Sequence, residues 1–211
     1  MEIVAVYTAQ SLPFTLDFDN HIWAPAHVHP LDYDWRGAEA PAELKTVARL
    51  LWTDEEIFIG FTCSFTELDV DEEFSSAVER HALWDRDVCE IFIAPDPANP
   101  ARYFEFEAAP TGEWVDLGII VRPDGRETDW DFVSGFTTTA KLDCEQLTIE
   151  MRIPWSEAIP KPAAGDVWRV NLFRCVGPEA PERYLAWSPT RTPEPNFHVP
   201  EAFGELRFIS R

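Results

Sequence analysis

The chain has 211 residues, with 38 Asp and Glu against 17 Lys and Arg, which gives a formal net charge of −21. This length can bury a large core, and 45% hydrophobic with 13% aromatic residues excludes a disordered chain. The negative charge repels phosphate backbones and anionic headgroups, which excludes nucleic acid and membrane surfaces as general partners. Eighteen prolines, nine glycines and nine tryptophans favour a β-rich domain with stiff loops.

Short apolar or alternating runs follow one another along the chain, separated by polar or proline-containing turns. We expect about eleven short strands, over residues 3–7, 44–52, 56–65, 87–94, 103–108, 114–121, 136–142, 147–155, 166–176, 184–187 and 205–209. Turn signals between them include the Pro-Asp-Gly run at 123–125. Only residues 75–83 carry a helical pattern, of one or two turns. Residues 17–41 are dense in Pro, His, Asp and Trp and are expected to wrap one edge as irregular structure.

This pattern predicts an all-β fold, a β-sandwich of two sheets with an immunoglobulin-like or jelly-roll-like architecture and an irregular N-terminal segment. There is no internal repeat, low-complexity tract or flexible linker, so residues 1–211 are expected to form a single domain. No run approaches the roughly 18 apolar residues of a membrane span, and the N-terminus lacks a signal-peptide pattern. The sequence does not name the compartment, although these features favour the cytoplasm.

Several familiar catalytic motifs are missing, among them phosphate-binding glycine loops, the serine nucleophile elbow and the paired-histidine zinc motif. The four cysteines (Cys63, Cys89, Cys144 and Cys175) are far apart and form no Cys-x-x-Cys pair. Three of them interrupt apolar strands, where cysteine is usually a small buried hydrophobe. We therefore expect reduced, structural thiols rather than disulfides or metal ligands.

Two stretches combine aromatic and polar side chains more densely than an ordinary core strand. In residues 83–93, Leu-Trp-Asp-Arg-Asp-Val-Cys-Glu-Ile-Phe-Ile, Trp84 precedes a hydrophobic strand that contains Glu90. In the second, Trp-Ser-Pro-Thr at 187–190 leads to Phe197 and His198 on a loop bounded by prolines. Because a ring on such a loop cannot be buried in a strand ladder, it often faces a ligand. The alternatives are that Trp84 caps the core and Phe197 pins its loop.

These stretches resemble carbohydrate-binding module family 9 and its family 9-like relatives. The first match is Trp84-x-x-Asp87-x-x-Glu90-Ile-Phe-Ile, and the second is Trp-Ser at 187–188 followed by Phe197 and Phe-Gly-Glu-Leu at 203–206. The strand pair over 49–61 and Tyr-Phe-Glu-Phe at 103–106 also fit, so the resemblance covers residues 44–208. It implies a β-sandwich that binds a mono- or oligosaccharide by its end, without cleaving it.

The resemblance also implies roles for individual residues. Trp84 and Phe197 would be the two rings that clamp the sugar, and Glu90 would accept hydrogen bonds from sugar hydroxyl groups. His198 is a further candidate for hydrogen bonding, although a loop histidine can equally bond the backbone. Two positions depart from the family pattern: Glu105 stands where the family has an arginine, and Phe173 stands where it has a glutamine. Glu105 is the fifth candidate ligand-binding residue. The sugar and the oligomeric state stay open.

The acidic stretch 66–73 offers hard oxygen ligands at Asp69, Asp71 and Glu73, which makes it a candidate Ca²⁺ site. The resemblance favours a structural calcium ion, because family members carry one, and no other cofactor is expected. The stretch lacks the residue order of an EF-hand loop, so a solvated acidic loop is the alternative.

The carboxylates of the strands leave two rival functions open. Glu105 and Glu107 alternate along residues 103–108, which fits either the solvated face of an edge strand or a hydrolytic pair. A small carboxylate-based glycoside-active enzyme using Glu90, Glu105 or Glu107 is therefore one rival. Glu90 can otherwise pair with an arginine such as Arg86 or Arg174. The second rival is a protein-interaction domain with a decayed sugar site, which fits the departures at Glu105 and Phe173.

Overall fold

The computed structural model describes residues 1–10, 12–71, 76, 78–177 and 183–210, and this part of the chain is built almost entirely of strands. Three single-turn 3₁₀ helices interrupt them: η1 (Ala42–Leu44), η2 (Leu83–Asp85) and η3 (Pro200–Ala202). The strands are β1 (Glu2–Tyr7), β2 (His29–Pro30), β3 (Tyr33–Asp34), β4 (Thr46–Trp52), β5 (Glu56–Ser64), β6 (Val88–Ala94), β7 (Arg102–Ala108), β8 (Trp114–Arg122), β9 (Gly125–Asp129), β10 (Thr137–Leu142), β11 (Gln146–Pro154), β12 (Val167–Cys175), β13 (Tyr184–Ala186) and β14 (Gly204–Ile209).

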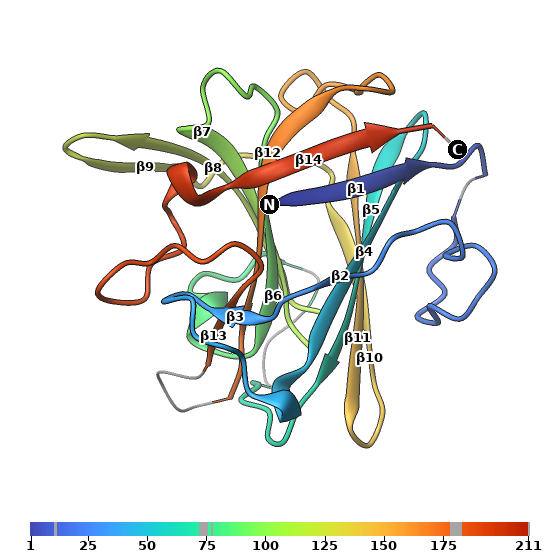
Figure 1. Cartoon of the computed structure of the whole chain (residues 1–211), viewed down its shortest axis with the longest axis vertical. Coiled ribbons are helices and arrows are strands. Elements are labelled where there is room, and N and C mark those ends of the chain that lie inside the picture. Colours follow the sequence, from blue (N-terminus) through green and yellow to red (C-terminus); the bar gives the residue numbers. More distant parts are fainter. Residues whose placement is uncertain (11, 72–75, 77, 178–182, 211) are drawn as a thin grey trace.

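The strands form one hydrogen-bonded path in the order β10-β11-β5-β4-β1-β14-β12-β6-β7-β8-β9. This path folds over at β1 and β14, which run across the top of the molecule in Figure 1, so that two groups of strands face each other. The first layer contains β10, β11, β5 and β4, and the second contains β12, β6, β7, β8 and β9. The β-sandwich expected from the sequence is therefore confirmed, with β1 parallel to both of its neighbours.

The main core lies between the two layers and is filled by alternate residues of each strand. Ile57, Ile59 and Phe61 of β5 point inward, as their alternation predicts, and they meet Ile91 and Ile93 of β6. Side chains of this size contribute about 1.5–3 kcal/mol each when fully buried. Because strand side chains alternate between faces, the residues between these point to the outer face of each layer.

The outer face of the first layer is covered by the N-terminal segment. Trp23 is buried there beside Phe58 of β5, in a second apolar cluster. Phe18 packs so closely on Gly60 that a Cβ at this glycine would lie 2.3 Å from the Phe18 ring. A glycine in the middle of β5 thus makes room for the covering segment. The irregular structure expected over 17–41 is present apart from the two-residue strands β2 and β3.

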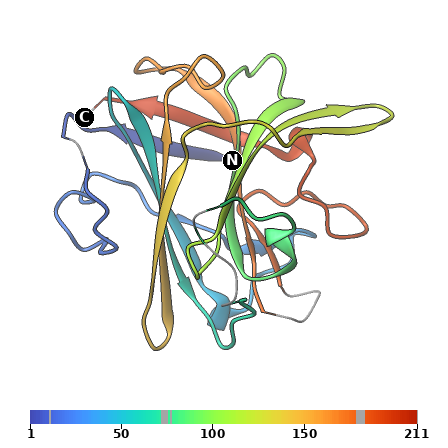
Figure 2. The same cartoon turned by 180° about the vertical axis from the view of Figure 1, so that it is seen from behind.

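The outer face of the second layer carries a third apolar cluster, which includes Phe92 of β6, Tyr103 of β7, Leu117 of β8 and Phe173 of β12. In the described part of the chain, this face is covered by loops, by η2 and by strand β9, and the β8–β9 hairpin projects beyond the body of the sandwich (Figure 1, Figure 2). This incompletely covered face positions the candidate site.

All eleven strands expected from the sequence are present, with ends that differ by a few residues. The sequence analysis missed β9 and the two-residue strands. The helical turn expected over 75–83 falls partly outside the described residues, and residues 78–82 are not helical. The four cysteines are unpaired, and Cys63, Cys89 and Cys175 are buried as expected. No helix in the described part of the chain is long and apolar enough to cross a membrane.

Candidate functional site

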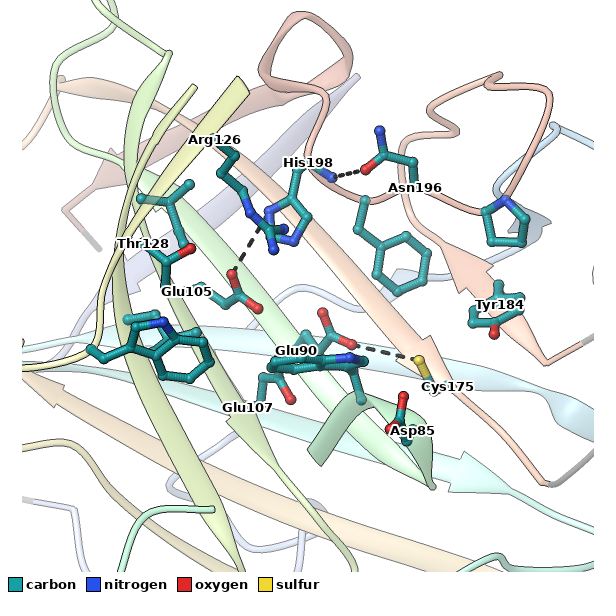
Figure 3. A pocket seen from close by; sticks show the side chains of 16 residues that line it. Asp85, Glu90, Glu105, Glu107, Arg126, Thr128, Cys175, Tyr184, Asn196 and His198 are labelled. Carbon is teal, nitrogen blue, oxygen red and sulfur yellow. Dashed lines mark hydrogen bonds and ion pairs between the residues drawn. The ribbon is translucent and has the colours of Figure 1, made fainter. Parts of the chain in front are cut away.

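A pocket of about 280 Å³ lies over the outer face of β6, β7 and β8 (Figure 3). Its walls come from η2, from the hairpin strand β9 and from the loop that precedes η3. All five residues singled out from the sequence as ligand-binding candidates line it: Trp84, Glu90, Glu105, Phe197 and His198. The fold thus brings together residues that are up to 114 positions apart in the sequence. Their contact with a ligand stays a prediction.

Aromatic rings form much of the pocket wall. Trp84 is half-buried on η2, and its ring centroid lies 6.3 Å from that of Trp130, which in turn stacks on His81 at 4.1 Å. Phe197 stacks on Phe173 with ring centroids 4.0 Å apart and an interplanar angle of 9°. Phe173, which stands where the resemblance expects a glutamine, is therefore the platform that holds Phe197.

The pocket floor is formed by three glutamates, Glu90 of β6 and Glu105 and Glu107 of β7. The register pairs Glu90 directly with Glu107, and Glu105 lies two residues along the same face. One carboxylate oxygen of each lies within 4.8 Å of the others, and the three residues are at most 2% exposed. Figure 3 shows the three carboxyl groups gathered below His198 and Arg126.

Burial and mutual repulsion dominate the electrostatics of this floor. Burial, followed by the charges of Glu90 and Glu105, raises the pKa of Glu107 well above its usual value. Burial and then the charge of Glu105 do the same for the pKa of Glu90. Burial also raises the pKa of Glu105, while a hydrogen bond with Glu107 and then the charge of Arg126 act in the opposite direction. Glu105 and Glu107 are hydrogen-bonded to each other, and among the described residues no donor from outside the three glutamates serves either oxygen of Glu107.

Two alternatives left open by the sequence are wrong. Glu105 and Glu107 do not form a solvated edge, because β7 lies between β6 and β8 and both side chains are buried. In the described part of the chain, Glu90 forms no ion pair with an arginine. Arg174 donates to Thr46 Oγ1 at 2.8 Å, Arg86 forms its ion pair elsewhere, and the nearest donor to Glu90 is the Cys175 thiol at 3.6 Å.

His198 is held in a fixed, uncharged form. Its Nδ1 lies 2.7 Å from the hydroxyl of Tyr103, and the Oδ1 of Asn196 accepts a hydrogen bond from its backbone N–H. Burial lowers the pKa of His198 to about 3, so the ring is neutral at pH 7. The same Nδ1 lies 3.8 Å from Oε2 of Glu105, so His198 links the hydroxyl of Tyr103 to the pocket floor.

Sequence reasoning missed the contribution of β9 to the pocket. Arg126 and Thr128 of this strand line the site together with Trp130, which follows it. The signal was present, since a Pro-Asp-Gly turn ends at Gly125 and the next alternate positions are Arg126, Thr128 and Trp130. Arg126 supplies a cation that the departure at Glu105 had left missing.

The acidic stretch proposed for calcium lies apart from this floor. Asp69 forms an ion pair with Arg86 at 2.6 Å, and Asp71 lies 3.6 Å from the same guanidinium. Glu73 lies outside the described residues. Calcium binding at Asp69, Asp71 and Glu73 stays a prediction. Within the described ranges, the floor glutamates are the one group of three ligand-type side chains close enough to share a metal ion.

A β-sandwich with an aromatic-walled pocket on the outer face of one sheet defines a class of small binding domains. The sequence places the chain more narrowly, because the model of the family described as "Carbohydrate family 9 binding domain-like" matches residues 18–211. The chain belongs to this family. A comparison with the curated proteins finds no match.

Solved structures show the same fold at low sequence identity. A candidate carbohydrate-binding protein from Bacteroides uniformis ATCC 8492 has a TM-score of 0.73 at 19% identity, with 98% of each chain covered. A family 9 carbohydrate-binding module from Caldicellulosiruptor kristjanssonii, in complex with cellotriose, has a TM-score of 0.69 at 15% identity, covering 100% of this chain and 95% of that one. A family 9 module from the same organism, in complex with glucose, has a TM-score of 0.67 at 17% identity. The match covers 100% of this chain and 97% of that one.

Proposed function

We propose that the chain is a non-catalytic carbohydrate-binding domain that takes the end of a mono- or oligosaccharide into the pocket. Trp84 and Phe197 stack on the sugar, and the carboxyl group of Glu90 accepts hydrogen bonds from sugar hydroxyl groups. The observation that carries this proposal is the convergence of the five candidate residues on one pocket, in a chain of a carbohydrate-binding family. Because two structural relatives are complexes with cellotriose and glucose, glucosides are the first ligands to test.

The surroundings of the two rings support this role. The apolar C–H face of a pyranose stacks on an aromatic ring, and each such contact contributes about 1–3 kcal/mol. Trp84 stays half-buried beside Trp130, and Phe173 fixes the orientation of Phe197 before any ligand arrives. Pre-ordered rings lose little conformational freedom on binding. Asn196, Arg126 and His198 add hydrogen-bonding groups around the opening, and dissociation constants between about 1 μM and 1 mM are expected.

The test is calorimetric titration of glucose, cellobiose, cellotriose and xylose oligomers, comparing the wild type with Trp84→Ala. The loss of one stacking contact should weaken binding by at least about 5-fold. Tyr33→Ala is the matched control, because it removes an aromatic ring that is 36% exposed and outside the pocket. Equal affinity in the wild type and Trp84→Ala, with circular dichroism unchanged, would remove Trp84 from the site.

The three neighbouring carboxyls favour a second candidate, a small glycoside-active enzyme. A carboxyl with a raised pKa is what a general acid needs, and Glu90 lies beside Glu107, a second carboxyl, on the pocket floor. Incubation of pure protein with aryl glycosides and oligosaccharides tests it. Product that disappears in Glu90→Gln would establish catalysis. If the wild type gives no product, carbohydrate binding is the one proposed function that remains.

A further inference from the structure

The glutamates on the pocket floor have an arrangement that a sugar contact alone does not explain. We infer that Glu90, Glu105 and Glu107 together bind one divalent cation that prefers oxygen ligands, with Ca²⁺ as the test ion. This site is distinct from the acidic stretch at Asp69 and Asp71, whose carboxylates face Arg86.

The backbone geometry fixes the three carboxyls on one side of the second layer. Glu90 and Glu107 are register partners on adjacent strands, and Glu105 follows on the same face of β7. One oxygen from each lies within 4.8 Å of the other two. Oxygens around a Ca²⁺ ion at the usual 2.3–2.6 Å are separated by at most about 5 Å, so a single ion can contact all three.

The floor also lacks the partners that buried carboxylates normally have. In the described part of the chain, no donor from outside the three glutamates serves either oxygen of Glu107, which is 0% exposed. Oε2 of Glu105 also lacks a hydrogen bond from outside this group, with the Nδ1 of His198 3.8 Å away. Buried charges are normally paired, hydrogen-bonded or bound to a metal. Glu105 and Glu107 are lining residues of the pocket, which gives a cation a route to them from solvent.

The charge balance of the pocket favours a divalent ion over a monovalent one. Asp85 adds a fourth carboxyl to the lining, and Arg126 is the single guanidinium among the described residues that line the pocket. A cation binds to deprotonated carboxylates, so the floor glutamates release any proton they hold when the ion enters. Four carboxylates and one arginine then carry a charge of about −3, which a divalent ion lowers to about −1.

The donor set indicates which kind of cation is bound. Three carboxylates are hard ligands, which suit Ca²⁺, Mg²⁺ or Mn²⁺ rather than a soft metal. The Nδ1 of His198 is already engaged by Tyr103. Ca²⁺ takes six to eight oxygens, of which three glutamates supply three to six. The remaining positions face the cavity and are available to water or to hydroxyl groups of a ligand.

The experiment uses the full chain, stripped with EDTA and dialysed, and titrated with CaCl₂ and MgCl₂ by calorimetry. Tb³⁺, an oxygen-seeking substitute for Ca²⁺, gives a second readout, because Trp84 and Trp130 line the pocket and sensitise its emission. Changes outside the first ligand shell already weaken metal sites about 10–100-fold, so Glu107→Gln should weaken binding at least about 10-fold. Glu145→Gln, an exposed glutamate on the β10–β11 hairpin, should bind as the wild type does.

Three outcomes would overturn the inference. The first is no heat and no sensitised emission from the wild type, and the second is equal affinity in the wild type and Glu107→Gln. The third is binding that is lost in Asp69→Asn but kept in Glu107→Gln, which would assign the ion to the acidic stretch. If Glu107→Gln fails to fold by circular dichroism, Glu90→Gln is used with the same expectation. Since no sugar is present, failure here leaves the proposed function standing, and the sugar titration can fail while the metal binds.

Discussion

The outer faces of the two layers each bury a glutamate in the middle of a strand, with opposite results. On the first layer, Glu150 of β11 accepts hydrogen bonds from the hydroxyl of Thr15 at 2.8 Å and from the backbone N–H groups of Thr15 and Leu16. On the second layer, Glu107 of β7 has no such donor in the described residues. Both are at most 2% exposed.

This difference separates a carboxylate that the covering segment bonds from one that faces a pocket. The N-terminal segment covers the first layer and supplies the donors that Glu150 needs, so this carboxylate is both buried and hydrogen-bonded. The loops over the second layer supply aromatic rings and leave a pocket above Glu107. Burial of a carboxylate is thus compatible with either role, and the supply of donors from the covering segment decides between them.

The largest expected effect tests whether the N-terminal segment is a structural cover. Trp23→Ala should lower the free energy of unfolding by about 3–5 kcal/mol, because the buried indole of Trp23 fills the second apolar cluster against Phe58. Trp130→Ala is the comparison on the other face. It should lower the free energy of unfolding far less, since Trp130 is 39% exposed. Urea denaturation measures both. Equal losses would mean that the two faces do not differ in this way.

A pair of isosteric substitutions compares the two glutamates directly. Glu150→Gln should lower the free energy of unfolding by about 1–2 kcal/mol, because donors aimed at a carboxylate lose their charged partner. Glu107→Gln should leave it unchanged or raise it, since at pH 7 Glu107 either keeps a proton that the unfolded chain releases or stays charged without a partner. Denaturation in EDTA at pH 7 gives both values, and a larger loss in Glu107→Gln would contradict the comparison.

The third expected effect is a pH dependence of the free energy of unfolding, caused by His29 at the edge of the covering segment. Burial lowers the pKa of His29, so the unfolded chain binds a proton more readily than the folded one, and stability falls as the pH drops below about 6.5. His29→Gln should remove this part of the slope, at most about 1.4 kcal/mol per pH unit. Denaturation midpoints of the two proteins between pH 7.5 and 5.5 measure it. Parallel profiles would show that His29 does not contribute.

The smallest expected effect concerns the opening of the pocket. Arg126→Ala should weaken binding of a saccharide about 2–10-fold by removing one hydrogen-bonding group, with stability unchanged because the side chain is exposed. Arg122→Ala, on the same hairpin, removes an exposed arginine that pairs with Glu127 outside the pocket and should keep wild-type affinity. Equal affinities in both variants, measured by calorimetry, would exclude Arg126 from the site.

The fold was largely predictable because strand alternation is a local property. The inward positions of β5 follow from the period of two in its residues, and a strand of that pattern needs a second layer to cover it. The strand β9 was missed because Gly-Arg-Glu-Thr-Asp contains no apolar residue, and pairing with β8 rather than burial holds it. Its contribution to the pocket, Arg126, was missed with it.

The sequence by itself determined the β-sandwich, and a family resemblance led from its motifs to five residues that line one pocket. Only the tertiary structure decided the environment of each carboxylate. Glu107 and Glu150 have the same chemistry and the same place in an alternating strand, and no local pattern separates them. Whether a donor reaches a buried oxygen depends on segments far away in the sequence. Thr15 reaches Glu150 across 135 positions, whereas no covering segment in the described chain donates to Glu107. Burial and bonding depend on which surfaces meet, and only folding brings those surfaces together.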